Sequence, residues 1–404
     1  MQTDPRAAGM DAERLERITE HLQARYVDPG KIAGCQATVW RDGSLAYSRS
    51  LGSSDLERGT PVRDDTVWRI YSMTKPITSV ALMTLYERGL FQLSDPVHRF
   101  LPEWRDLRVA QVGANGDTTL VEPERPMSVR DLLMHMSGLT YGGDPSHPVD
   151  RRYGEAGVAD RSVTLDTFVK KLADIPLKFS PGTRWHYSYS TDVCGRLVEV
   201  LSGCPLDEFL ATEIFAPLGM HDTAFHIRDD QVDRFAANYM RGPDKSLRLI
   251  DDPRASAYQH APAFLSGGGG LVSTTADYLR FCRMLLAGGE LDGARVLGSR
   301  TIDLMTDNHL PGGGDLARFA LGAFGETGFE GIGFGLGFAV GLGPVASQSI
   351  GSAGEYYWGG AASTIFWIDP VEDLIVIFMT QLMPSATFNF RGQLKALVYP
   401  AIVD

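Results

Sequence analysis

Hydrophobic and polar positions change their spacing along the chain, and β-type patterns are concentrated at its two ends. Near the N-terminus, residues 35–41 and 45–50 flank Asp42-Gly43, a dipeptide that accepts the positive φ angles of a tight turn. These runs predict a β-hairpin, preceded by an amphipathic helix within the first 22 residues. Three stretches rich in β-branched and aromatic residues follow near the C-terminus, at 333–343, 357–369 and 374–380.

The middle of the chain has helical spacing instead. Apolar positions predict helices at residues 128–136, 164–173, 191–201 and 207–215. Two more helices are predicted among the C-terminal β-type stretches, at 273–287 and 390–398. We therefore predict an α/β (α+β) fold in which both chain ends form one sheet, interrupted by a mainly helical domain. The predicted boundaries are 1–75 and 231–404 for the α/β domain and 76–230 for the helical domain.

A helix predicted from Pro76 to about Arg88 is apolar on nearly all sides, which indicates that it is buried. Directly before it stands Ser72-Met73-Thr74-Lys75. At this spacing the serine and lysine side chains share one helix face, with Cβ atoms roughly 5–6 Å apart. A lysine amine can activate a serine nucleophile when its charged form is destabilised. Ser72 could also be an ordinary helix N-cap, but a lysine beside so apolar a helix is harder to explain structurally.

Two more segments carry candidate chemistry. Tyr187 lies in an aromatic run after the turn at Pro181-Gly182. A tyrosine beside a lysine ammonium loses its proton more easily and can relay protons. On a predicted strand, Gly359 and Gly360 would let another backbone approach closely, and a free backbone N–H in this segment could stabilise an oxyanion.

These segments, in this order, resemble the serine β-lactamase and penicillin-binding protein superfamily. The nearest resemblance is to its carboxylesterase branch, the family VIII esterases related to class C β-lactamases. Its Ser-x-x-Lys motif falls on Ser72 and Lys75, its Tyr-x-Asn motif on Tyr187-Ser188-Tyr189, and its Lys-Thr-Gly strand on Trp358-Gly359-Gly360. Residues 135–139, 217–220 and 267–271 also look like family landmarks. The resemblance implies a β-lactamase-like fold, with an antiparallel sheet flanked by helices and an active site between the two domains.

The chain departs from the β-lactamase pattern at two positions. Tyr189 stands where lactamases carry an amide, and Trp358 where they carry the lysine that binds a substrate carboxylate. Both changes favour uncharged esters over lactams or peptides, and an indole suits a hydrophobic substrate group. We expect Tyr189, Trp358, Gly359 and Gly360 to contribute to substrate binding, although Trp358 could equally be an interior strand aromatic.

The resemblance implies acyl transfer through an acyl-enzyme. Ser72 would be the nucleophile, Lys75 and Tyr187 would activate it, and the backbone N–H groups of Ser72 and Ala361 would hold the oxyanion. Lys75 must be neutral near pH 7–8 for this chemistry, shifted by burial from its usual pKa of about 10.4. The expected function is a serine carboxylesterase acting on short-to-medium acyl esters. Alternatives are a β-lactamase, a D-amino-acid peptidase or amidase, a transacylase, or a non-catalytic penicillin-binding-like module that binds ligands.

Composition narrows the choice of partners. The net charge of −12 argues against nucleic acids and anionic membrane surfaces. Four cysteines are too few for a disulfide framework in 404 residues, and no histidines show metal-ligand spacing. No serine lies in a Gly-x-Ser-x-Gly elbow, which excludes the usual α/β-hydrolase motif. We expect a small-molecule ester as substrate, no cofactor and no metal, and a cytoplasmic location, with a mature exported form as the alternative. The oligomeric state is not determined by the sequence.

Overall fold

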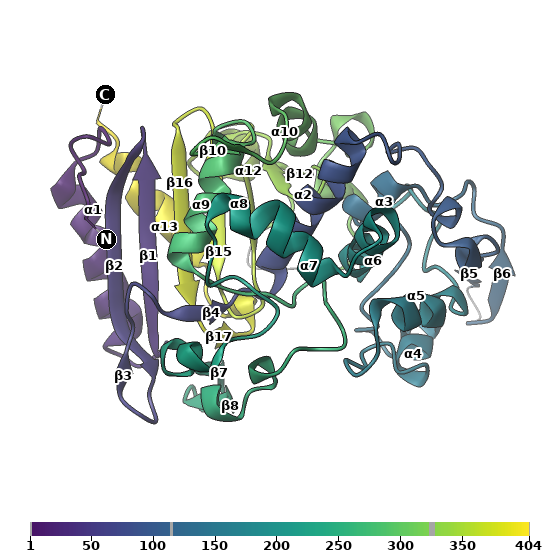
Figure 1. The fold of residues 1–404 in the computed structure, drawn as a ribbon, viewed down its shortest axis with the longest axis horizontal. Coiled ribbons are helices and arrows are strands. Elements are labelled where there is room, and N and C mark those ends of the chain that lie inside the picture. Colours follow the sequence, from purple (N-terminus) through teal and green to yellow (C-terminus); the bar gives the residue numbers. More distant parts are fainter. Residues whose placement is uncertain (1, 114–115, 323–327, 404) are drawn as a thin grey trace.

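The two ends of the chain meet in one antiparallel sheet of eight strands (Figure 1). The computed structural model describes residues 2–113, 116–322 and 328–403. In spatial order the sheet contains β12 (Ile332–Phe334), β13 (Ala339–Gly341), β14 (Tyr356–Gly359), β15 (Ile365–Asp369), β16 (Leu374–Thr380), β1 (Gly34–Arg41), β2 (Ser44–Asp55) and β3 (Thr60–Pro61). The predicted antiparallel sheet built from both chain ends is confirmed.

The N- and C-terminal parts of the sheet join where β1 pairs with β16, in a register that sets Cys35 opposite Thr380. The predicted hairpin is β1 and β2, with Asp42 and Gly43 both at positive φ. The β-type stretches at 333–343 and 357–369 each form two strands rather than one. Their turns contain Gly337 and Ser363, again at positive φ.

Helices pack against this sheet, so its central strands are buried along their whole length. Every residue of β15 and β16 is buried. α1 (Ala12–Leu22) and α13 (Phe390–Val398), from opposite ends of the chain, pack together, and α9 (Thr275–Leu286) packs against β16 (Figure 1). Burial on both sides explains why these strands read as continuous apolar runs rather than as alternating ones.

Most of the helical part lies beyond one edge of the sheet, whereas its last short helix packs against α9 (Figure 1). It contains α2 (Thr74–Glu87), α3 (Val129–Leu133), α4 (Pro148–Glu155), α5 (Leu165–Ala173), α6 (Ser190–Ser202), α7 (Leu206–Leu210) and α8 (Ala216–Leu218). It is not purely helical, because β5 (Val109–Val112) pairs with β6 (Thr118–Val121) within it. All four residues of β6 are exposed, so no buried face produced the alternation that would have predicted this hairpin.

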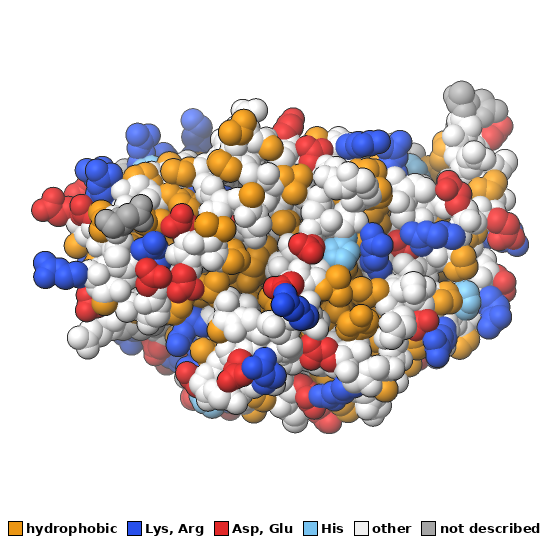
Figure 2. Space-filling view, turned by 90° about the horizontal axis from the view of Figure 1, so that it is seen from above, with side chains coloured by type: hydrophobic (Ala, Val, Ile, Leu, Met, Phe, Trp, Pro, Cys, Tyr) orange, Lys and Arg blue, Asp and Glu red, His pale blue; other side chains and the backbone are white. Residues whose placement is uncertain are grey.

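The remaining elements are short. They are β4 (Val67–Arg69), β9 (Val272–Thr274), β7 (Asn238–Arg241), β8 (Leu247–Asp251), β17 (Leu382–Met383), β10 (Glu290–Leu291), β11 (Ala294–Arg295), α10 (Ser299–Thr306), α11 (Leu316–Phe319) and α12 (Pro344–Ser347). β4 pairs with β9, and β7 pairs with both β8 and β17. On the face drawn in Figure 2, positive and negative side chains are interspersed and neither sign forms a continuous patch.

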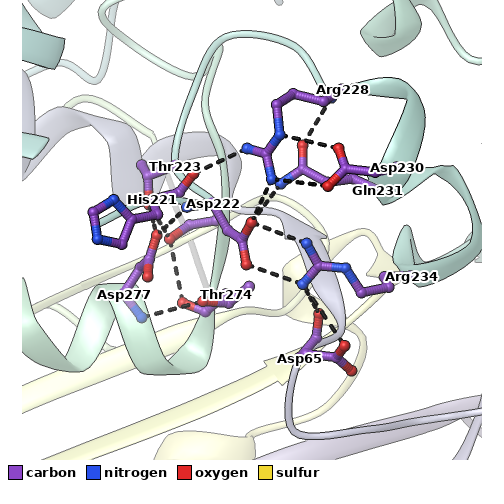
Figure 3. A network of polar contacts seen from close by, with 11 residues as sticks. Asp65, His221, Asp222, Thr223, Arg228, Asp230, Gln231, Arg234, Thr274 and Asp277 are labelled. Atoms are coloured by element: carbon purple, nitrogen blue, oxygen red, sulfur yellow. Dashed lines mark hydrogen bonds and ion pairs between the residues drawn. The ribbon is translucent and has the colours of Figure 1, made fainter. Parts of the chain in front are cut away.

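A network of charged residues ties the segment after α8 to α9 (Figure 3). The Asp222 carboxylate accepts hydrogen bonds from Arg228, from Gln231 and, through both of its oxygens, from Arg234. The Asp222 backbone N–H donates to Asp277 Oδ2, on the first turn of α9, at 2.7 Å. The two arginines hold the pKa of Asp222 down, at about 2. The network thus holds the start of the segment that leads from α8 to Tyr258.

Candidate active site

Ser72 lies at a sharp change of direction between a strand and a buried helix. β4 ends at Arg69, a 3₁₀ turn spans Tyr71–Met73, and α2 begins at Thr74. Tyr71 has a φ of 42°, a left-handed conformation that costs energy for a residue with a side chain. The strained turn places Ser72 at the wall of two cavities.

Lys75 lies directly beneath the serine. Its Nζ is 3.1 Å from Ser72 Oγ and 2.6 Å from the carbonyl oxygen of Gly268. The side chain is almost wholly buried, with 1% of the residue exposed. Burial is the main cause that lowers the pKa of Lys75 to about 7; the Asp192 carboxylate opposes this shift and the Arg161 cation adds to it. A large fraction of the amine is therefore neutral near pH 7, as the expected chemistry requires.

Tyr187 completes the group. Ser72, Trp358 and Tyr141 bring hydrogen-bonding groups close to its hydroxyl. The Lys75 ammonium lies over the ring, 4.5 Å from its centroid, rather than at the phenolic oxygen. Burial raises the pKa of Tyr187 well above its usual value, and these hydrogen bonds offset only part of that rise. The expectation of an easily ionised tyrosine is therefore wrong, because desolvation outweighs the nearby cation. At neutral pH this hydroxyl keeps its proton and can act as a donor.

Two cavities meet at these residues. The smaller has a volume of about 130 Å³ and the larger about 460 Å³. Ser72, Tyr187 and Ala361 line both, so any group bonded to Ser72 Oγ has space on two sides. Among the described residues, no acceptor is hydrogen-bonded to the Ala361 N–H. That N–H is thus available at the cavity wall, where an oxyanion would need a donor.

The predicted substrate-binding residues fall into two groups. Trp358 is buried at the wall of the smaller cavity, which Gly359 and Gly360 also line. Gly360 also permits the close approach expected of it, because a Cβ there would lie 2.4 Å from the Ile70 carbonyl oxygen. Tyr189 is different: it precedes α6 and packs edge-on against Tyr141, with ring centroids 4.4 Å apart. It is not among the described residues that line either cavity, so its expected contact with substrate is corrected to support of the wall.

Several residues of the site carried no role in the sequence analysis. The larger cavity is lined by Tyr141, Arg161, Asp192, Tyr258, Phe264 and residues 268–270. Tyr141 follows shortly after the landmark at 135–139, and Gly268 lies in the landmark at 267–271, so proximity to these motifs was the available signal. Arg161, Asp192 and Phe264 lie outside any motif and are brought to the cavity by tertiary packing alone.

Within residues 2–113, 116–322 and 328–403, no helix is long and apolar enough to cross a bilayer. No cluster of three or more histidine, cysteine, aspartate or glutamate side chains is arranged around a possible metal position in that part of the chain. The expectation that the chemistry needs neither metal nor cofactor stays a prediction.

The fold and the arrangement of Ser72, Lys75 and Tyr187 define a serine hydrolase of the β-lactamase-like class. The family model described as Beta-lactamase matches residues 16–399, and the chain belongs to this family. An uncharacterized protein of Mycobacterium tuberculosis is 35% identical over 365 residues, which are 90% of this chain and 89% of the relative.

Two better described proteins are also similar. Esterase EstB of Burkholderia gladioli is 31% identical over 393 residues, 93% of each chain. Among solved structures, EstCE1, described as a hydrolase with promiscuous acyltransferase activity, superimposes with a TM-score of 0.80 at 27% identity. The superposition covers 96% of this chain and 99% of that one. These similarities are consistent with the resemblance to family VIII esterases.

Proposed function

We propose that this protein is a serine carboxylesterase that hydrolyses short-to-medium acyl esters through an acyl-enzyme on Ser72. One observation carries the proposal: a buried amine whose pKa is lowered to about 7 lies 3.1 Å from the Ser72 hydroxyl. A serine is a weak nucleophile until a base takes its proton, and a desolvated lysine supplies that base at neutral pH. The similarity to an esterase that aligns over almost the whole chain supports the same chemistry.

Acylation follows from these positions. Ser72 gives its proton to neutral Lys75 as Oγ bonds to the ester carbonyl carbon, and the backbone N–H groups of Ser72 and Ala361 stabilise the resulting oxyanion. When the intermediate collapses, the C–O bond to the alcohol breaks. The departing alkoxide takes the proton of Tyr187, and a proton from the Lys75 ammonium, relayed by water that enters the site, then restores the tyrosine. The net proton transfer is from serine to alcohol.

Deacylation uses the same groups with water in place of the alcohol. Water gives a proton to Lys75 and bonds to the acyl carbon. Ser72 Oγ then leaves and recovers the proton from the ammonium, which releases the acid and restores the starting state. The rate of both half-reactions depends on a neutral Lys75, so kcat/KM is expected to rise through pH 6–8.

The walls of the smaller cavity favour uncharged groups. Its volume of about 130 Å³ suits a short acyl chain, and Trp358 places an indole where β-lactamases carry a lysine. An indole cannot neutralise a carboxylate, so binding a lactam carboxylate there would leave the charge unpaired in an apolar site. We therefore propose esters as the preferred substrates over β-lactams and D-amino-acid peptides.

The test is hydrolysis of p-nitrophenyl acetate, butyrate and octanoate, with a chromogenic cephalosporin in parallel. Wild-type turnover of the short esters should fall by at least about 10³ in Ser72→Ala. Ser79→Ala is the matched control, because Ser79 is a buried serine on the same helix whose Oγ has no hydrogen-bond partner among the described residues. Ester turnover that survives in Ser72→Ala would refute the proposal. Fast lactam opening without ester turnover would favour the lactamase, and stoichiometric acylation without turnover would favour a binding module.

Acyl transfer to an alcohol is a second candidate. The observation that favours it is the larger cavity of about 460 Å³, which Ser72 also lines and which could hold an acyl acceptor. The solved relative EstCE1 is described as having promiscuous acyltransferase activity. Added alcohols should then raise p-nitrophenol release and yield a transacylated ester. If release and free acid stay equal at every alcohol concentration, hydrolysis alone is the reaction.

A further inference from the structure

Asp192, on the first turn of α6, is a buried carboxylate beneath the larger cavity. Its Oδ1 accepts hydrogen bonds from Ser266 Oγ at 2.5 Å and from the backbone N–H of Gly268 at 3.1 Å. The contact is close, because a Cβ at Gly268 would lie 2.4 Å from Asp192 Oδ2. The carboxylate thus fixes the backbone of Gly268 from one side.

The same glycine meets Lys75 on its other side. The Gly268 carbonyl oxygen accepts a hydrogen bond from Lys75 Nζ at 2.6 Å, and Nζ is also 3.1 Å from Ser72 Oγ. A carbonyl oxygen can only accept, so a neutral amine must spend one N–H on Gly268. That bond turns the amine so that its lone pair can face the Ser72 hydroxyl. The position of the Gly268 carbonyl therefore decides whether Lys75 is aligned as a base.

We propose that Asp192 is a positioning residue for Lys75. Asp192 holds the Gly268 carbonyl that orients the amine, and its negative charge, opposed by the positive charge of Arg161, sets the charge balance around Lys75. The inference rests on the proposed function of Lys75 as the base. It assigns a second task to the larger cavity, whose wall carries both charged residues. Asp192 acts through Lys75 and Gly268 and needs no contact with the substrate.

The groups around Lys75 leave these two charges opposed. Its described titratable neighbours are Tyr141, Tyr187, His135, Asp192 and Arg161. Burial raises the pKa of both tyrosines and lowers the pKa of His135 well below its usual value, so these three are neutral at pH 7. Asp192 raises the pKa of Lys75 and Arg161 lowers it. Removing the Asp192 charge should therefore lower the pKa of Lys75, and removing the Arg161 charge should raise it.

The experiment measures the pH dependence of kcat/KM for p-nitrophenyl butyrate in Asp192→Asn and Arg161→Gln. The asparagine oxygen can still accept from Ser266 and Gly268, but the charge is gone, so the acid limb should move down by about one pH unit. Arg161 is more exposed, so Arg161→Gln should move the limb up by about half a unit. Asp303→Asn is the control for Asp192→Asn, because it changes the net charge by the same amount at an exposed position, and it should leave the acid limb in place.

A third variant separates orientation from charge. Ser266→Ala removes one hydrogen bond to Asp192 and keeps its charge, so kcat should fall several-fold with an unmoved limb. It also keeps the inference testable if Asp192→Asn does not fold. Limbs that stay in place, or that move in the same direction, in Asp192→Asn and Arg161→Gln would overturn the inference. These outcomes are distinct from a failure of the proposed function, which would appear as absent wild-type ester turnover or as turnover that survives in Ser72→Ala.

Discussion

The site around Lys75 and the network around Asp222 both lower a pKa, yet by opposite physical causes. The pKa of Lys75 is lowered to about 7 because burial disfavours its charged form. The pKa of Asp222 is lowered to about 2 because Arg234 and Arg228 favour its charged form, and this effect exceeds the opposing effect of burial. A lowered pKa therefore means a destabilised charge in one region and a stabilised charge in the other.

The difference separates reactivity from stability. A carboxyl pKa lowered from 3.8 to about 2 corresponds to about 2 kcal/mol of folding free energy at neutral pH. The shift of the Lys75 pKa from 10.5 to about 7 corresponds to a cost on the order of 5 kcal/mol below pH 7. The molecule carries that cost beside Ser72, where a neutral amine is needed, whereas the buried Lys395 has the Glu355 carboxylate as a partner.

Lys75→Met should produce the largest effect and the sharpest test of this contrast. Activity should fall by about 10³ or more, because no other described group lies close enough to Ser72 to accept its proton as a neutral amine. Stability should rise by about 2–3 kcal/mol at pH 7, since methionine has a similar volume and no charge to bury, less the lost hydrogen bonds. The unfolded chain binds a proton that the folded chain releases between pH 7 and 10, so the gain should shrink as pH rises through that window.

Lys395→Met is the matched control, because Lys395 is an equally buried lysine that is paired with Glu355. Removing it leaves the Glu355 carboxylate buried without its cation, so stability should fall by about 3 kcal/mol. Urea unfolding of both variants measures the two signs. If Lys75→Met destabilised the protein as Lys395→Met does, Lys75 would be a structural cation and the contrast would fail.

Tyr187→Phe tests the effect of burial on a group whose charged form is the deprotonated one, so that burial raises its pKa instead of lowering it. Burial raises the pKa of Tyr187, so its proton is retained and serves the leaving alcohol. The variant should lose about 10² in kcat, the usual size of a lost proton donor. The loss should be smaller for esters of acidic alcohols such as p-nitrophenol than for ethyl esters, which need the proton more. An equal loss for both would mean that Tyr187 supports the site only through packing.

Short-range patterns predicted the elements that position the nucleophile. The apolar character of residues 77–85 indicated a buried helix, and α2 is buried along most of its length. The spacing of Ser72 and Lys75 placed both on one face because one helical turn separates them. The strands of both chain ends followed from β-type composition, and their assembly into one sheet followed from the order of elements. These are properties that neighbouring residues determine together.

Long-range proximity was not predictable in the same way. Asp192 and Arg161 reach the cavity because α6 and the loop before α5 pack around it, and no local pattern marks them. The pKa of Tyr187 was misjudged because a sequence shows the lysine but not the extent of burial. Tyr189 was assigned to the substrate on the strength of its motif, whereas its ring packs against Tyr141. The β5–β6 hairpin was missed because β6 is exposed.

Asp222→Asn should destabilise the protein by about 2 kcal/mol at pH 7, because Arg234 and Arg228 lose the carboxylate that they share. The folded-state pKa is depressed, so this stabilisation is fully present above the unfolded-state value of about 3.8 and is lost as pH falls towards 2. Thermal unfolding at pH 7, 4 and 2.5 should show the gap between wild type and variant closing. A gap that is constant with pH would assign the loss to packing instead.

Added salt should give the smallest effect, and it should weaken the stabilisation by Asp222 while leaving the pKa of Lys75 nearly unchanged. The Arg228 side chain is 50% exposed and Asp222 22% exposed, so ions can screen their attraction. From 0.1 to 1 M NaCl the gap between wild type and Asp222→Asn should shrink by about 0.5 kcal/mol. The acid limb of the pH–rate profile should move by less than about 0.2 pH unit, because Lys75 is shifted mainly by desolvation and not by a charge that solvent ions can reach. A limb that moved with salt as much as the stability gap did would mean that exposed charges, and not burial, set the reactivity of Lys75.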